Sequence, residues 1–530
     1  MLQDNIPQAL NDLIKGAGPE YSTERIDDRY FGFRAFLCND DGFIVRIRRA
    51  AIQNLTIVDD LALWHYYGHI VIQNPDEVLE RTTQRTLKTG IEDMQSYRFR
   101  GDGRDYIFIE FSPLDSNNIQ TAKPIDNEVY KIRHFCAIHK IEDLDTGEYG
   151  DQKTRPEMKL KKLTFHDYNY QLLLERNAYY STGQFNRKNN DSKITTPLTQ
   201  MTNTERERHT GDIIKDIITN TLPNINHVFD ENFSIGATKT FFTSTAQSAA
   251  AEDINQILAR HITDEDEKCL LRQERTTGKW TLLPISEYFN RALKDQNTAG
   301  EWLRERLTIG SQANSQDMTT VIRRTPIEGT SISTNLHFPD QSVIEQYMFY
   351  DTDAMNVQCK LASRPVHYKD GKTGRFSVSV EENEIENVRD YFQDKYIAKL
   401  TGDGRAGGAH NNIIIDDSRR ECKNINVLFS GGNTPKKALT VGKSSTALDV
   451  IFTGNFMTYT VKGDTTRRSG RFFSLDRPGT YLPADYDDKI LGLYLITKTV
   501  HRLTPFGYTN DIVGLKPYSF KNMEFREDIE

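Results

Sequence analysis

Histidine and cysteine side chains in one short segment form the sequence pattern that comes nearest to a metal site. The segment KIRHFCAIHK carries His134, Cys136 and His139. In a strand His134 and Cys136 share one face while His139 points to the other, so the three cannot bind one ion without a bend. His65 and His69 in WHYYGH form a second pair with no further ligands nearby. We predict that all five residues are structural and that the protein has no metal or other cofactor.

A nucleotide site is the next kind of chemistry to test. The segment VGKSS at 441–445 resembles the end of a phosphate-binding loop. That loop, GxxxxGK[ST], requires glycine where this chain has Lys437, and it should open a helix, whereas the strand-like LDVIF follows here. We therefore read SGGNTPKK and TVGKSS as turns and predict no nucleotide binding.

Hydrolytic chemistry has no motif in this chain. A glycosidase needs two carboxylates at a fixed separation, one of them in an apolar pocket. With 75 acidic residues, candidate pairs are too common to be informative. GxSxG, HExxH and Cys/His nucleophile patterns are absent from the sequence as well. We predict that the protein is not an enzyme and we name no catalytic residues.

The bulk composition indicates a folded chain of several domains. Its 530 residues exceed the size of one hydrophobic core, and 27 Phe and 24 Tyr supply apolar side chains to bury. The formal charge of −8 arises from 67 basic and 75 acidic residues that are mixed along the chain, so no overall field attracts a phosphate backbone. We predict no specific binding to nucleic acid.

Two short basic clusters and the cysteines complete this survey. Each cluster is expected to be a solvated strand face or a local partner contact. The clusters are Arg46, Arg48 and Arg49, and Arg467, Arg468 and Arg471. The cysteines are odd in number, scattered and without a CxxC pair, so we expect them to be reduced and mostly buried. They are Cys38, Cys136, Cys269, Cys359 and Cys422. With no membrane-length apolar run and no signal-like N-terminus, a soluble protein made in a cytoplasm is expected.

Hydrophobic periodicity gives the order β, α, mixed, β along the chain. Period-2 alternation in GFIVRIRR, GDGRDYIFIEF, KIRHFCAIHKI and MKLKKLTF predicts strands between 28 and 165. Helical spacing appears near 167, over HTGDIIKDIITNTLP and over AAAEDINQILARHI, and Thr210 is expected to cap the second of these helices. Strands return after 425, where the hydroxyl-rich face of NFMTYTVKGD is suited to packing beside another subunit.

The predicted fold class is α+β and multidomain, with two β-barrel domains separated by a helical and mixed insert. The expected divisions are a β-barrel at 1–180, a polar linker at 181–205, a helical domain at 206–310, a mixed α/β domain at 311–400, a Gly-rich loop at 401–424 and a second β-barrel at 425–530.

The C-terminal β segment resembles the last barrel of the central baseplate hub proteins of contractile-tailed bacteriophages, which are related to type VI secretion spike hubs. The matching stretches are FTGNFMTYTVKGDTTRRSGRFFSLDRPG and ILGLYLITKTVHRLTPFGYTNDIVGLKP. The motif positions are Val461, Gly463 and Asp464, then Gly470, Phe472 and Phe473, then Gly492, Tyr494, Leu495, Ile496, Thr497 and His501. Gly463 and Asp464 are expected to form a tight hairpin. The order of earlier segments is similar to the family's first barrel and helical insert.

This resemblance implies a homotrimer whose subunits each supply two related barrels to a pseudo-sixfold ring. Such a ring would join a sixfold tail tube to a threefold spike, with other baseplate proteins as neighbours, in the tail of a virion. The resemblance identifies no interface residues. The tracts at 181–205 and 401–412 are hypothesised to contact other baseplate proteins. The alternatives are a virion-associated cell-wall hydrolase or carbohydrate-binding tail protein, and a peripheral baseplate wedge protein.

Overall fold

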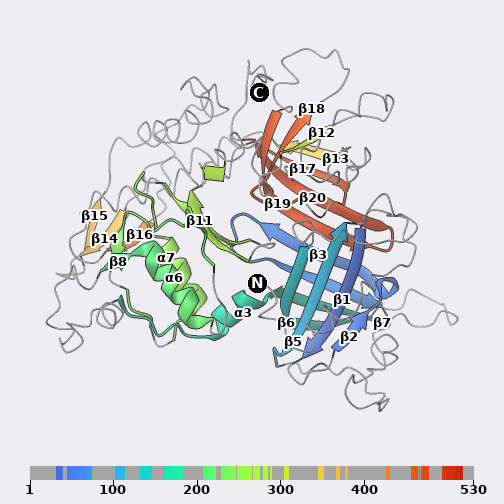
Figure 1. Cartoon of the computed structure of the whole chain (residues 1–530), viewed down its shortest axis with the longest axis horizontal. Coiled ribbons are helices and arrows are strands. Elements are labelled where there is room, and N and C mark those ends of the chain that lie inside the picture. The colour runs from blue at the N-terminus through green and yellow to red at the C-terminus, as the bar shows by residue number, and fades with distance from the viewer. Residues whose placement is uncertain are drawn as a thin grey trace.

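The computed structural model is built mainly of β-strands with a few short helices (Figure 1). The described residues are 31–39, 44–73, 99, 102–113, 132–145, 159–182, 207–222, 228–240, 242–245, 247–265, 267–274, 278–284, 287–288, 304–308, 344–350, 366–370, 376–379, 425–429, 455–463, 465, 467–476 and 492–516. The predicted predominance of strands over helices after residue 28 and again toward the C-terminus is confirmed.

The largest sheet contains strands from both ends of the chain. Its N-terminal strands are β1 (Phe31–Asn39), β2 (Ile44–Ile47), β3 (Ile52–Asp60), β4 (Tyr67–Gln73), β5 (Asp105–Pro113), β6 (Ile132–Asp145) and β7 (Lys159–Asp167). Its later strands are β12 (Arg304–Thr308), β13 (Ile344–Tyr350), β17 (Asn455–Lys462), β18 (Phe472–Asp476), β19 (Gly492–Thr504) and β20 (Gly507–Lys516).

The order of these strands shows how the two β regions join. The path runs β13-β17-β20-β19-β3-β4-β7-β6-β5-β1-β2, and a branch runs from β19 through β18 to β12. Within the described residues this path is open at β13 and at β2, so the two closed barrels of the prediction are not seen there. The two β regions share one sheet because β19 pairs with β3.

The sheet branches at strand β19, one edge of which pairs with two different strands, and we call this branch point the fork. Its first residues pair with β18, in register from Gly492 with Leu475 to Leu495 with Phe472. On the same side, its last residues pair with β3, from Lys498 with Asp60 to Leu503 with Leu55. An irregularity between Ile496 and Lys498 separates the two ladders. A bulge of this kind bends and twists a strand, which allows β19 to serve two differently directed half-sheets.

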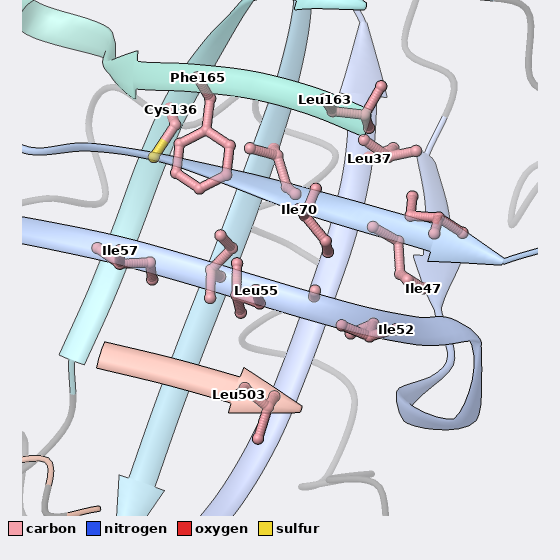
Figure 2. Close-up of a cluster of buried hydrophobic side chains, with 14 of the residues drawn as sticks. Leu37, Ile47, Ile52, Leu55, Ile57, Ile70, Cys136, Leu163, Phe165 and Leu503 are labelled. Atoms are coloured by element: carbon pink, nitrogen blue, oxygen red, sulfur yellow. The ribbon is translucent and has the colours of Figure 1, made fainter. Parts of the chain in front are cut away.

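The N-terminal half-sheet encloses the largest apolar core. Alternation along the strands sends one set of side chains inward, among them Leu37, Ile57, Ile70 and Phe165. Figure 2 shows β3 and β4 crossing over β1, with aliphatic side chains filling the space between them. Leu503 of β19 lies beside this core in the same view. The C-terminal segment therefore completes the hydrophobic core of the N-terminal region.

The other face of β1, β5 and β6 is buried as well. Phe36, Tyr106, Phe108 and Phe135 form a second aromatic cluster there. GDGRDYIFIEF thus has apolar side chains on both faces, which is typical of a strand that is covered on both sides.

A separate core supports the C-terminal half-sheet. Met457, Tyr459 and Val461 of β17 are buried, while Thr458 and Thr460 remain partly exposed. This confirms the predicted alternation. Phe473 of β18 stacks on Tyr494 of β19 with ring centroids 4.9 Å apart, and Tyr459 meets Phe473 edge-on. The two half-sheets therefore have distinct cores on either side of the fork.

Three helices and two small strand pairs form a middle region. They are α3 (Tyr168–Glu175), α6 (Thr210–Thr221), α7 (Ala250–Leu258), the pair β8 (Arg208–His209) and β9 (Lys239–Thr240), and the pair β10 (Cys269–Gln273) and β11 (Trp280–Pro284). Their apolar faces meet in one cluster that includes Leu173, Ile217, Ile254 and Trp280. In Figure 1 these helices lie to one side of the large sheet.

The helix starts differ in part from their predictions. Asp167 caps α3 by accepting a hydrogen bond from the Tyr170 amide at 3.0 Å. The residue preceding α6 is His209, and Thr210 is its first helical residue, so the predicted cap at Thr210 is wrong. The physical reason is a competing partner, since the Thr210 hydroxyl lies 2.9 Å from His261 Nδ1. The predicted isoleucine stripe of α6 is buried, which confirms that face.

Several strands lie between 300 and 430. β12 and β13 pair with β18 and β17 of the C-terminal half-sheet. A further small sheet has the order β15-β14-β16, from β14 (Val366–Asp370), β15 (Phe376–Ser379) and β16 (Ile425–Phe429). The tracts at 181–205 and 401–412 lie almost wholly outside the described residues.

Candidate functional site

The histidines of the metal-like pattern KIRHFCAIHK pack against other side chains. His134 and Cys136 are fully buried on one strand face, where the His134 ring meets Tyr66 at a centroid distance of 4.3 Å. His139 is exposed and stacks on His166 at 4.5 Å. Across the part of the chain that the structure describes, no group of three potential ligands could hold a metal ion.

The two histidines of the second pair, His65 and His69, also lie apart. His65 stacks on Tyr170 of α3 with ring centroids 3.5 Å apart, and burial lowers the pKa of His65 to about 4. His69 lies on β4, 3.3 Å from the Asn54 amide nitrogen. The two imidazoles have different neighbours and do not converge. The phosphate-loop-like segment at 441–445 and Lys437 lie outside the described residues.

A serine and a histidine in the middle region come nearest to a catalytic pair. His261 Nε2 lies 3.2 Å from Ser234 Oγ, but its Nδ1 meets the Thr210 hydroxyl where a triad would have a carboxylate. His261 is fully buried, and this burial lowers its pKa to about 3. Gly236, at φ +84°, packs so tightly on this imidazole that an added Cβ would lie 2.7 Å from it. We interpret the pair as a packed polar core.

Buried and partly buried carboxylates of the described residues have structural partners. Glu110 lies between Arg34 and Arg133 on neighbouring strands. Asp216 accepts a hydrogen bond from Tyr180 at 2.9 Å and pairs with Arg208. The Ser248 hydroxyl donates to Asp253 at 2.8 Å. A hydrolase would use such a group as an acid, base or nucleophile, whereas these groups hold neighbouring elements together.

The fork of the sheet is where three distant segments meet through charged and polar groups. Arg272 of β10 donates to both Asp59 oxygens, at 3.1 and 3.4 Å, and also to the Ser469 carbonyl. The Ser469 amide donates to Asp59 at 3.1 Å. We call these three residues the fork junction. It ties the end of β3, the middle region and the loop before β18 at one buried point.

Backbone contacts close this junction on the β19 side. The Leu61 amide donates to the Thr497 carbonyl at 2.7 Å, and the Gly470 amide donates to the Ile496 carbonyl at 2.7 Å. Gly470 has φ +81°, and an added Cβ would lie 2.7 Å from Arg272 Nη1. The motif glycine therefore provides both the left-handed turn and the space in which Arg272 reaches the loop.

The basic cluster in this loop is buried. Arg467, Arg468 and Arg471 each expose less than a tenth of their surface, so their predicted solvated strand face is wrong. Arg467 donates to Asn510 Oδ1 at 3.1 Å, and Asn510 lies 3.0 Å from His501 Nδ1. The loop crosses the fork instead of lying on an outer strand, which explains the burial. In the other basic cluster Arg49 is also buried, while Arg48 is exposed.

Gly463 does not form the predicted hairpin. β17 pairs with β13 and β20, and β18 pairs with β12 and β19, so β17 and β18 are not neighbours. Instead the Gly463 amide donates to the Tyr508 carbonyl at 2.8 Å and extends the ladder with β20. A Cβ at this position would lie 2.0 Å from the Tyr508 ring. The glycine is required for close approach and not for a turn.

Replacing Gly463 by alanine is therefore expected to lower the free energy of unfolding by about 1–3 kcal/mol, because the added methyl forces the Tyr508 ring away from His501. Thermal unfolding measures this loss. The double variant Gly463→Ala/Tyr508→Ala should cost less than the sum of the two single changes, since both act on one contact. Thr458→Ala, on the half-exposed face of β17, is the matched control and should change little. Additive losses would contradict the steric explanation.

The sequence pointed to part of this site only. Gly470 belongs to the recognised motif and the arginines beside it were singled out. Asp59 and Arg272 were missed, because they are 213 residues apart and no spacing rule joins them. Leu61 and the loop residues likewise meet only in the folded chain.

In the described residues, no helix is both long and apolar enough to span a bilayer.

Comparison with solved structures identifies similar chains. The 43 kDa tail protein of prophage MuSo2 from Shewanella oneidensis is 10% identical, with a TM-score of 0.42 over 92% of this chain and 98% of its own. A tail protein from Neisseria meningitidis MC58 is 9% identical, with a TM-score of 0.40 over 91% and 96%. The E. coli c3393 protein, a component of the type VI secretion system, is 7% identical, with a TM-score of 0.33 over 89% and 76%.

These neighbours are phage tail and type VI secretion proteins, the class that the C-terminal motif resembles. Their TM-scores lie below 0.5, so the likeness by itself establishes no shared activity. No family model matches the chain, and no curated protein matches it.

Proposed function

We propose that this chain is a structural protein of a phage tail baseplate, and more specifically a homotrimeric hub that joins a sixfold tail tube to a threefold spike. The observation that carries the proposal is the fork at β19, which places two half-sheets with separate cores side by side in one chain. Three such chains around an axis would present six β units. A closed ring of this kind would satisfy the sheet edges that the described residues of a single chain leave open.

The chemistry of the fork supports a mechanical role. The fork junction fixes the middle region and the crossing loop to both half-sheets through a buried ion pair. Such a connection transmits displacement between the half-sheets, because a packed and hydrogen-bonded core does not deform continuously. Gly470, a motif residue of the resemblance, lies at this connection and contacts Arg272. The proposed protein is not an enzyme and needs no cofactor.

The test is the solution mass of the full-length chain by light scattering, alone and with a tail-tube protein and a spike protein from the same source. We expect a mass of three subunits, either in the free protein or on mixing, and co-elution with both partners. A chain that stays monomeric and ignores both partners would contradict the hub. Wall-hydrolysis and sugar-binding assays on the same sample would then address the alternatives.

A further inference from the structure

We propose that Phe506 is the knob of a head-to-tail contact between copies of this chain, and that it docks on an apolar patch at the opposite end of the sheet. The proposal rests on the trimeric hub proposed above and names the surfaces that would hold that trimer together.

Phe506 is placed where its aromatic side chain is not covered by the described residues of its own chain. It is 96% exposed, whereas the other phenylalanines whose burial the structure describes are buried or half-buried. Together with Pro505 it forms the two-residue tip between β19 and β20, which we call the Phe506 tip. An isolated, fully exposed ring gains its burial energy only on association.

The tip is anchored by hydrogen bonds on both of its sides. The β19–β20 ladder continues to the pair Thr504 and Gly507 at its very end. The buried Arg49 side chain donates to the Thr504 carbonyl and fastens the tip to the short 3-10 segment Arg49–Ala51. A preorganised aromatic loses little conformational entropy on binding, so it is well suited to anchor a contact. Beside Arg49, the exposed Arg48 gives this end of the sheet a positive charge.

The opposite end of β3 carries a complementary surface. Leu63 and Trp64 follow β3, and the Trp64 ring meets Tyr170 of α3 at 5.0 Å. Leu174 lies one helical turn beyond Tyr170 on the same face of α3. We call these four residues the α3 patch. Leu63 and Leu174 are exposed, and Trp64 and Tyr170 are partly exposed.

Acidic residues flank this patch. Asp60 lies next to Leu63, whose amide donates to the Asp60 carbonyl at 3.1 Å. Glu175 is exposed beside Leu174. The neighbouring Arg176 is exposed, and its guanidinium is engaged by the Thr221 carbonyl, to which it donates at 2.9 Å. An apolar knob beside a cation thus matches an apolar patch between two carboxylates, which favours a second copy of this chain as the partner.

The two surfaces lie at opposite ends of the same strand. The Phe506 tip lies toward the start of β3, since Leu503 pairs with Leu55, whereas the α3 patch follows the end of β3 at Asp60. The Phe506 tip therefore cannot contact the α3 patch of its own chain. A contact between two different patches on identical chains is heterologous, and it closes into a ring when the rotation allows it.

The experiment is concentration-dependent light scattering and sedimentation of the full chain. Phe506→Ser and Leu174→Ser should each raise the trimer dissociation constant by about tenfold or more, as expected for an anchor and its receptor. Ile235→Ser, an exposed apolar residue of the middle region, is the matched control and should leave the constant unchanged. All three sites are exposed, so circular dichroism melts should equal those of the parent.

A charge exchange separates this contact from nonspecific association. Arg48→Glu and Glu175→Arg should each weaken the trimer, and the double variant should restore it. If the Phe506→Ser variant has the same trimer dissociation constant as the parent, the role of Phe506 is overturned and the proposed hub function is not. If the double variant Arg48→Glu/Glu175→Arg does not restore the trimer, the pairing of the Phe506 tip with the α3 patch is overturned. A parent chain that is monomeric with and without its tail partners overturns both the contact and the hub.

Discussion

Replacement of Arg272 by methionine is expected to lower the free energy of unfolding by about 3–5 kcal/mol, because it leaves the Asp59 carboxylate buried without its guanidinium. Asp59 is 7% exposed and Arg272 is 14% exposed at the side chain, so water cannot take over the lost contacts. Methionine preserves much of the volume and removes only the charge and its hydrogen bonds. Urea unfolding followed by tryptophan fluorescence measures the change, since Trp64 and Trp280 lie at and within the middle region.

The location of the loss is as informative as its size. Arg272 fastens the middle region to β3 and to the loop before β18, so limited proteolysis should cut the variant between these parts sooner than the parent. The surface pair Arg502 and Asp511 supplies the control, because its side chains are 49% and 29% exposed. Arg502→Met should cost no more than about 1 kcal/mol. Equal losses in the two variants would show that the junction does not join the regions.

A double variant tests the cause of the loss. When Asp59→Asn is combined with Arg272→Met, the uncompensated charge disappears and part of the stability should return. The Asn side chain keeps an oxygen for the Ser469 amide. A double variant no more stable than Arg272→Met would contradict the uncompensated Asp59 charge as the cause of the loss.

The local structure of this chain follows from its sequence where one face of an element is apolar. The alternation of Met457, Tyr459 and Val461 predicted β17, and the four isoleucines of α6 predicted its buried face. These patterns depend on neighbours a few residues apart. The short-range physics of periodicity and burial is therefore sufficient to find them.

The joining of the half-sheets could not be predicted in this way. Leu503 pairs with Leu55 and Arg272 reaches Asp59, and in each case the two residues are far apart in the chain. Every strand has two edges, and periodicity does not say which other strand lies at either edge. The same limit produced the error at Gly463, where a Gly-Asp pair indicated a hairpin but the Tyr508 ring explains the glycine.

The buried Arg34–Glu110–Arg133 row is a second place where a local pattern concealed a long-range contact. The three residues are in register across β1, β5 and β6. Arg34 makes two parallel hydrogen bonds to Glu110, each of 2.9 Å, and Arg133 donates to the same carboxylate. The period-2 alternation of GDGRDYIFIEF by itself places Glu110 only on a strand face. Its position between two cations makes it the central charge of that face.

Glu110→Gln is accordingly expected to lower the free energy of unfolding by about 3–5 kcal/mol, because both guanidinium groups lose their buried carboxylate while the shape is kept. Arg133→Gln should cost less than Arg34→Gln, since Arg133 is 17% exposed and makes one hydrogen bond to Glu110, whereas Arg34 is 6% exposed and makes two to it. Urea unfolding of the three variants gives this order. Because a buried row is weakly screened, the Glu110→Gln loss should persist in about 1 M salt. A loss that disappears in salt would place the row at the surface and remove its role in holding β1, β5 and β6 in register.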